Sequence, residues 1–290
     1  MATTEKQHKE LKALISLLDE PDSEIYEQVR EKICAYGTLA IPVLESSWEQ
    51  SFDPFLQERM EEIIHRIQLD DLYAGLSSWS QLYSDDLLKG FMLAARYQYP
   101  DLDAEKVFKQ VGQLVQDVWL ELNDKLTALE KIKVVNHILF DVHKFRGNKA
   151  DINSPDNFYL NLLLETKKGN PLSIGILFMI ISRSLKLPVY GVDLPNHFVL
   201  AFMDELRADG DQKNSTALFY INPFNRGTLF THNEIEAYIR QMKLKHQDSF
   251  FRPCDNITIM KRVFGELIIL YHQQGNMKKA EELKKLASAL

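Results

Sequence analysis

The residues best placed for chemistry are a histidine and an asparagine in the middle of the chain. Two β-rich runs there predict an antiparallel pair of strands joined across the polar loop 204–216. If Met203 faces Ala217 in that pair, His197 comes within one residue of facing Asn222. Opposed residues in such a pair have Cβ atoms roughly 4.5–5.5 Å apart. The pattern therefore predicts an imidazole within hydrogen-bond reach of a side-chain amide. These are the base and the orienting group of a cysteine–histidine–asparagine or cysteine–histidine–aspartate hydrolase.

Such a site also needs a nucleophile, and the start of a helix is the place to expect it. The helix dipole and the free backbone N–H groups there lower a thiol pKa and stabilise an oxyanion. A very apolar helix is predicted over residues 172–185, with Asn170 as N-cap and Pro171 in its first turn. Proline carries no nucleophile. Ser173 points about 200° away from the direction of residue 171, so capping is its favoured use and a nucleophilic role is the alternative.

Other polar residues near these elements are candidates for binding a ligand. Gly169 and Asn170 precede the apolar helix, and Asn157 lies in an extended polar loop, although a structural turn is the favoured use of Asn157. Arg226 follows Asn222 closely and suits an anionic ligand, with a structural salt bridge as the favoured alternative.

The two cysteines, Cys34 and Cys254, are too few for a disulfide framework or a structural zinc site. We expect both to be structural, and we expect neither a metal nor a cofactor.

The order of these residues resembles a transglutaminase-like core. Aligning the chain on Arg183 and Pro188 places the catalytic cysteine of that family at Pro171 and its aspartate at Asn222, and keeps its histidine at His197. The motifs that carry the resemblance are Lys168–Pro171, Arg183–Val189, Pro195–Phe198 and Ile221–Gly227.

A closer resemblance is to the bacterial SirB-type group, a transglutaminase-like domain with tetratricopeptide (TPR) repeats, and it covers nearly the whole chain. Members of that group commonly have proline where active enzymes have cysteine. The resemblance implies a core that has lost its catalytic cysteine, and a regulatory role. Its further motifs are Arg146–Asn148, Asn157, Leu160–Asn161 and Gly169–Ser173.

The elements that must position these residues predict an α+β fold in which a buried helix packs on an antiparallel sheet. The resemblance implies that this core is papain-like. Helical periodicity before and after this core predicts HEAT-like pairs at the start and a TPR-like pair at the end. The expected domains are a helical block at 1–83, a transglutaminase-like domain at 84–253, and a helical tail at 254–290. Within the second domain, 84–150 is a helical lead-in and 151–253 is the core.

Composition restricts the class of partner. The chain has 290 residues, with 34 Lys and Arg against 41 Asp and Glu, which gives a net charge of −7. This balance argues against a general nucleic-acid binder. The longest apolar run, Ile176–Ile181, is too short to span a bilayer. With no apolar segment typical of a secretory signal at the start, we expect a cytoplasmic protein without a membrane partner.

Two functions fit these features. The preferred one is a non-catalytic interaction protein whose degenerate cleft binds a peptide or a small polar ligand, and whose helical repeats contact a protein partner. The alternative is a hydrolase or acyl-transferase in which His197 is the base, Asn222 is the orienting residue, and the nucleophile is unidentified. The oligomeric state stays open.

Overall fold

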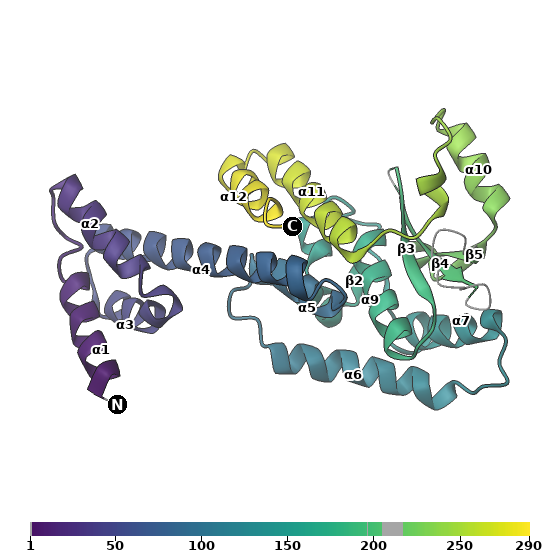
Figure 1. Ribbon diagram of the computed structural model, residues 1–290, viewed down its shortest axis with the longest axis horizontal. Coiled ribbons are helices and arrows are strands. Elements are labelled where there is room, and N and C mark those ends of the chain that lie inside the picture. The colour runs from purple at the N-terminus through teal and green to yellow at the C-terminus, as the bar shows by residue number, and fades with distance from the viewer. Residues whose placement is uncertain (1, 196, 205–216) are drawn as a thin grey trace. The chain divides into compact units, whose positions relative to one another are not determined.

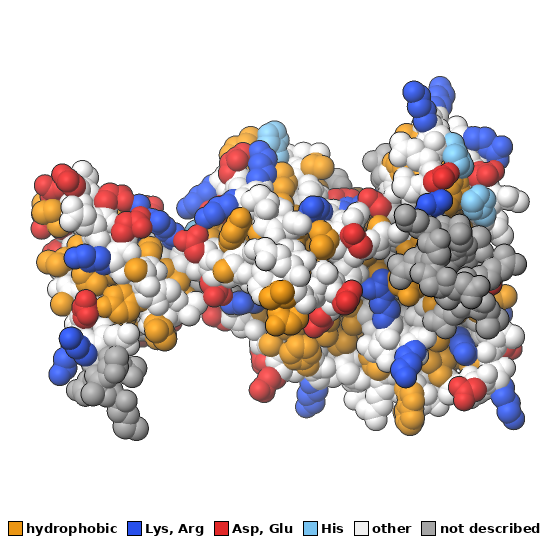
Figure 2. All heavy atoms as spheres, in the orientation of Figure 1, with side chains coloured by type: hydrophobic (Ala, Val, Ile, Leu, Met, Phe, Trp, Pro, Cys, Tyr) orange, Lys and Arg blue, Asp and Glu red, His pale blue; other side chains and the backbone are white. Residues whose placement is uncertain are grey.

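The chain forms two compact units in a computed structural model that describes residues 2–195, 197–204 and 217–290. One unit is Met1–Ser77 and the other is Ser78–Leu290, and helix α4 (Pro54–Leu82) passes through the boundary (Figure 1). The predicted polar loop lies outside the described residues beyond Asp204. On the face that Figure 2 shows, acidic and basic side chains are interspersed over both units.

The smaller unit is helical because polar caps and prolines separate its apolar stripes. The Asp22 carboxylate accepts hydrogen bonds from the backbone N–H groups of Glu24 and Ile25 and so starts a helix. Pro42 occupies the first turn of the next one. Leu18, Ile33 and Leu44 are fully buried in its core. The unit contains α1 (Ala2–Ile15), α2 (Ser23–Cys34), α3 (Ile41–Gln50) and the first part of α4.

A four-stranded antiparallel sheet forms the β part of the larger unit, and its strands pair in chain order. The sequence predicts three of these strands, at Pro188–Leu194, Phe198–Phe202 and Ala217–Ile221. The fourth is only three residues long and follows the turn at Gly227, so it is too short to give an alternating pattern. The strands are β3 (Val189–Leu194), β4 (His197–Met203), β5 (Ala217–Asn222) and β6 (Thr228–Phe230).

The register of β4 with β5 differs from the sequence-based expectation. Met203 does pair with Ala217, as predicted, but the pairing shifts at this point and Phe202 pairs with Phe219. The extra residue on β5 is characteristic of a β-bulge. Continued to the end of β5, the shifted register places Asn222 beside Val199, two residues from His197. The prediction of near-opposed His197 and Asn222 is therefore wrong in register.

The apolar helix α9 (Pro171–Ser184) begins one residue earlier than predicted and covers one face of the sheet. Its residues Leu172–Ser182 are all buried, as its apolar side chains require. A Cβ added at Gly175 would lie 2.8 Å from the Phe198 ring, which shows how closely α9 approaches β4.

The opposite face of the sheet packs against α10 (His232–Gln241). Val192, Val199 and Tyr220 from the sheet form one cluster with Ile235 and Ile239 of α10. Successive side chains of a strand alternate between faces. Phe198 therefore points to α9, while its neighbour Val199 points to α10.

Helices before and after the sheet complete the larger unit (Figure 1). The tail packs on the lead-in: the Tyr97 hydroxyl donates to Glu282 at 2.9 Å, and the hydroxyls of Tyr159 and Tyr271 lie 3.0 Å apart. The predicted mixture of many helices with a small antiparallel sheet is confirmed, whereas the HEAT-like and TPR-like assignments stay predictions. The helices are α5 (Leu87–Arg96), α6 (Ala104–Glu121), α7 (Ala128–Asn136), α8 (Leu160–Thr166), α11 (Asn256–Gln273) and α12 (Met277–Ala287).

Short irregular elements connect these helices to the sheet. A π-helical turn, His137–Val142, follows α7. Strands β1 (Arg146–Gly147) and β2 (Lys168–Gly169) form a two-residue parallel pair. Within the parts of the chain that the structure describes, no helix is both long and apolar enough to cross a membrane.

Candidate functional site

His197 begins β4 and pairs with Leu194 across a tight turn. Its ring stacks on Tyr238 of α10, with 5.7 Å between ring centroids and 24° between planes. The Tyr238 hydroxyl donates to the carbonyl of Pro195 at 3.0 Å. One tyrosine therefore supports both the imidazole and the turn before it, and the stacking places the imidazole on the α10 face of the sheet.

A second residue from a distant helix holds the same turn. The Arg262 guanidinium on α11 forms an ion pair with Asp193. It also donates to the carbonyls of Leu194 at 3.0 Å and His197 at 3.2 Å. Only 15% of the Arg262 side chain is exposed, so these bonds are shielded from water. The backbone of His197 is thus fixed from α11, and its ring from α10.

His197 and Asn222 line the same cavity, whose volume is about 240 Å³. The hydroxyls in its wall are engaged: Thr228 donates to the carbonyl of Asn225 at 2.6 Å, and Tyr238 donates to that of Pro195. Apart from His197, Asn222, Asn225 and one carboxylate, the rest of the described lining is apolar. The lining residues are Leu194, His197, Val199, Asn222, Asn225, Thr228, Leu229, Phe230, Glu234, Ile235 and Tyr238.

The carboxylate in the lining belongs to Glu234 in the first turn of α10. One of its oxygens accepts from the backbone N–H of Thr231 at 2.7 Å and from the Thr231 hydroxyl at 2.9 Å. These two hydrogen bonds lower the pKa of the Glu234 carboxyl, because they stabilise its charged form. The cavity therefore presents an anionic group near the imidazole.

The Asn222 amide does not orient the imidazole in this structure. Its oxygen accepts from the backbone N–H groups of Phe224 and Asn225, both at 3.1 Å, and so caps the turn after β5. Among the described residues, no hydrogen bond joins Asn222 to His197. The bulge explains the separation, since it moves Asn222 along the sheet by one residue.

The start of α9 does not reach this cavity. Asn170 and Ser173 form a reciprocal cap, with Ser173 N–H donating to the Asn170 side chain at 2.8 Å and the Ser173 hydroxyl accepting from Asn170 N–H at 3.1 Å. Ser173 is 1% exposed. Pro171, Asn170, Ser173 and Gly169 are all absent from the lining of the His197 cavity. The hydrogen bonds of Ser173 therefore match the helix-capping role, and not the nucleophilic role that was the alternative.

The remaining candidate residues have structural contacts. Asn157 is 3% exposed; its oxygen accepts from the Asn148 amide, and its own amide donates to the carbonyl of Asp151 at 2.7 Å. Arg226 forms an ion pair with Asp141, and 62% of its side chain is exposed. Gly169 accepts a backbone hydrogen bond from Asn148 at 2.8 Å. These residues hold loops around the core and do not join the His197 cavity.

Cys254 lies away from the cavity and is a poor nucleophile. Burial raises the pKa of its thiol to about 12, and the thiol donates to the Gly191 carbonyl at 3.3 Å. Burial also raises the pKa of the Cys34 thiol. Both observations fit the structural roles expected for the two cysteines.

Sequence reasoning missed Tyr238, Glu234 and Arg262, which support or line the site. For Glu234 a signal existed, because Thr231 and Glu234 have the spacing of a capping box at the start of a helix. For Arg262 and Tyr238 there was none, because both act across long sequence separations.

Comparisons with known proteins agree with the central part of this description. Residues 105–265 match the Transglutaminase-like superfamily. A UPF0162 protein of Xylella fastidiosa is 29% identical over 170 residues, which are 57% of this chain and 57% of that protein. F-box only protein 21 of Mus musculus is 28% identical over 145 residues, which are 50% of this chain and 22% of that protein.

These relatives are matched in part only. The chain spans 57% of the length of the Xylella protein and a smaller share of the mouse protein. A further relative, UPF0162 protein PM0557 of Pasteurella multocida, is 32% identical over 91 residues, 31% of this chain and 34% of its own. No solved structure matches at a significant level.

Proposed function

This chain belongs to the transglutaminase-like superfamily, and we propose that within it the protein is a non-catalytic interaction module. Its His197 cavity binds a small polar group, such as one side chain of a partner peptide. Pro171 stands where the cysteine of active members belongs, so the core acts as a scaffold.

One observation carries the proposal: every hydroxyl in the wall of the cavity already donates to a backbone carbonyl. Thr228 and Tyr238 are therefore poorly placed to attack a carbonyl group, and among the residues that the structure describes no cysteine or serine lines the cavity. A nucleophile must lie within hydrogen-bond reach of its base, roughly 2.6–3.2 Å. The Ser173 hydroxyl is instead held by Asn170 on a different element.

The size and polarity of the cavity support the kind of ligand proposed. Its volume of about 240 Å³ is below the range of about 300–1,000 Å³ that is typical of sites for whole small molecules. It combines apolar walls with the His197 imidazole and the Glu234 carboxylate. This combination suits a single side chain that carries a hydrogen-bond donor.

The experiment selects peptides that bind the intact protein from a display library and measures their affinity by calorimetry. His197→Ala and Glu234→Gln are expected to weaken binding by roughly tenfold, the value of one hydrogen bond to a charged group. His272→Ala is the matched control, because His272 is exposed on α11 and outside the cavity. Unchanged affinity in both cavity variants would contradict the proposal.

The same peptides, and simple amide and ester substrates, test the enzyme alternative. We expect no turnover and no labelling by fluorophosphonate under native conditions. If turnover occurs and is lost in His197→Ala while the circular dichroism spectrum shows an unchanged fold, the protein is a hydrolase that uses His197.

A further inference from the structure

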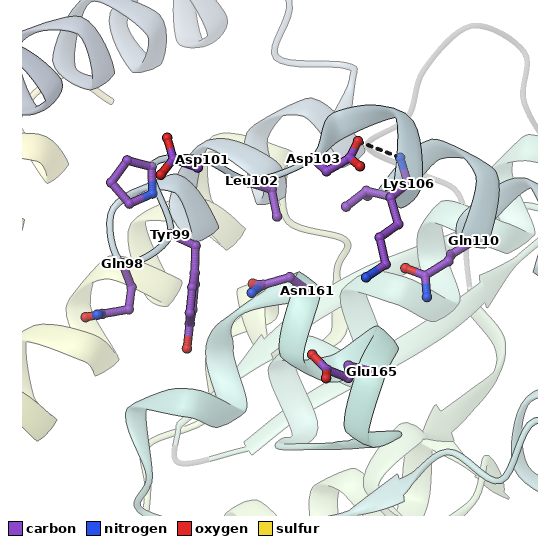
Figure 3. Close-up of a pocket in the computed structure, with 11 residues that line it drawn as sticks. Gln98, Tyr99, Asp101, Leu102, Asp103, Lys106, Gln110, Asn161 and Glu165 are labelled. Carbon is purple, nitrogen blue, oxygen red and sulfur yellow. Dashed lines mark hydrogen bonds between the residues drawn. The ribbon is translucent and has the colours of Figure 1, made fainter. Parts of the chain in front are cut away.

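A second and larger cavity lies in the helical part of the larger unit, away from His197. Its volume is about 500 Å³, within the usual range for small-molecule sites of about 300–1,000 Å³. It is bounded by the loop that joins α5 to α6, the first turns of α6, and α8 (Figure 3). Its lining is Gln98, Tyr99, Pro100, Asp101, Leu102, Asp103, Lys106, Val107, Gln110, Asn161 and Glu165.

An unsatisfied polar atom lies in this lining. The side-chain oxygen of Asn161 is shielded from solvent and has no hydrogen-bond partner among the described residues. Figure 3 shows the Asn161 side chain pointing from α8 toward the cavity. Buried polar atoms in native proteins are almost always paired, so an unpaired acceptor facing a cavity indicates that a donor binds there. One water occupies about 30 Å³, so the cavity has room for a larger donor.

Two opposite charges face the same space. Lys106 and Gln110 extend from α6 over Asn161 and Glu165 of α8 (Figure 3). Neither the Lys106 ammonium nor the Glu165 carboxylate forms an ion pair with any residue that the structure describes. Asp103 is already engaged, because its carboxylate accepts from the backbone N–H of Lys106 at 3.0 Å. The cavity therefore holds an available cation on α6 and an available anion on the opposing α8, and the Asp101 carboxylate of the connecting loop lies in the same lining.

We infer that this cavity binds a free amino acid, with its ammonium group between Asn161 and Glu165 and its carboxylate at Lys106 and Gln110. A zwitterion satisfies both charges at once and supplies the donor that the Asn161 oxygen lacks. Asp101 adds a second carboxylate to the lining, so neutral and basic amino acids bind better than aspartate or glutamate.

The test measures binding of each of the twenty standard L-amino acids, one at a time, to the full chain. Thermal shift gives the ranking, and the Asn161 side-chain amide resonances report on the site itself. We expect at least one neutral or basic amino acid to raise the melting temperature and shift those resonances. If none does so at millimolar concentration, the inference is wrong.

Charge variants then assign the two ends of the ligand. Glu165→Gln and Lys106→Gln are each expected to weaken amino acid binding by roughly tenfold. Butylamine binding should fall only in Glu165→Gln, and butanoate binding only in Lys106→Gln. Glu105→Gln and Lys109→Gln are matched controls, because these residues carry the same charges on α6 outside the lining.

Two results would overturn the assignment. One is an amino acid that binds equally well to the wild type and to both lining variants, which would place its site elsewhere. The other is loss of binding in the two control variants to the same extent, which would indicate general electrostatic attraction. The variants replace exposed side chains, so folding is preserved and circular dichroism checks it.

Discussion

At the scale of single residues, polar groups near the sheet are hydrogen-bonded to the backbone. Tyr238 and Thr228 donate to carbonyls, and Asn222 accepts from two backbone N–H groups. Cys254 follows the same pattern, since its thiol donates to the carbonyl of Gly191. A side chain that is hydrogen-bonded to the backbone stabilises a turn or strand and is less able to take part in a reaction.

The Cys254 thiol provides a prediction about pH. Burial raises its pKa to about 12, well above the ordinary value of about 8.5. At pH 8 the native protein therefore holds far less thiolate than an exposed cysteine would. In a Cys34→Ser variant, iodoacetamide should label the unfolded chain rapidly and the native chain very slowly. Equal rates at pH 8 would contradict the assignment.

The same pKa shift has a consequence for stability. The folded state favours the neutral thiol, so its contribution to the free energy of unfolding is complete below about pH 9. That contribution is lost as the pH rises toward 12, because the unfolded chain releases the proton more readily.

At the scale of elements, the faces of β4 decide which side chains can meet. Phe198 points to α9, and His197 stacks on Tyr238 of α10. The start of α9 approaches β4 and the turn after β5 closely, since a Cβ at Gly175 would lie 3.4 Å from Pro223. Position 171 is thus on a helix that contacts β4 and the turn after β5. This helix covers the α9 face of the sheet, whereas the His197 imidazole lies on the α10 face.

A cysteine placed at position 171 tests this arrangement. In Pro171→Cys, with both native cysteines changed to serine, we expect a thiol pKa below the ordinary value of about 8.5, because the thiol stands at a helix N-terminus. Adding His197→Ala should leave that pKa unchanged. The pH dependence of alkylation measures both values. A rise in the thiol pKa on removing His197 would show that the two groups interact.

Local patterns predicted most of these elements, and non-local geometry explains what they missed. Caps and apolar stripes located α9 to within one residue, because helix ends depend on nearby residues such as Asn170 and Ser173. The bulge at Phe202 and Met203 depends on two strands together, so no single run of sequence reveals it. His197 and Asn222 therefore line one cavity, but in a different register from the predicted one.

At the scale of the whole molecule, the superfamily match at 105–265 lies within the larger unit, Ser78–Leu290. Trp79 belongs to this unit although it lies near the end of α4. Its ring nitrogen donates to the carbonyl of Asp86 at 2.8 Å, and its ring fills the space where Gly90 has no side chain. We propose that an independent domain must begin before Trp79.

Two fragments test that boundary. A fragment of residues 78–290 retains Trp79, whereas one of residues 84–290 loses this fully buried ring. Loss of a buried tryptophan side chain typically costs about 3–5 kcal/mol, so the shorter fragment should unfold at clearly lower urea concentration. Coincident unfolding curves for the two fragments would contradict the proposal.

The stacking of His197 on the α10 side also limits what protein engineering can achieve with this scaffold. Point substitutions at the start of α9 change the attacking atom but leave the imidazole on the α10 side of the sheet. A design aimed at thiol chemistry would have to change chain length between His197 and Phe198, because one inserted residue turns a strand side chain to the opposite face. Insertion libraries, rather than substitution libraries, are the appropriate route to new catalysts from this framework.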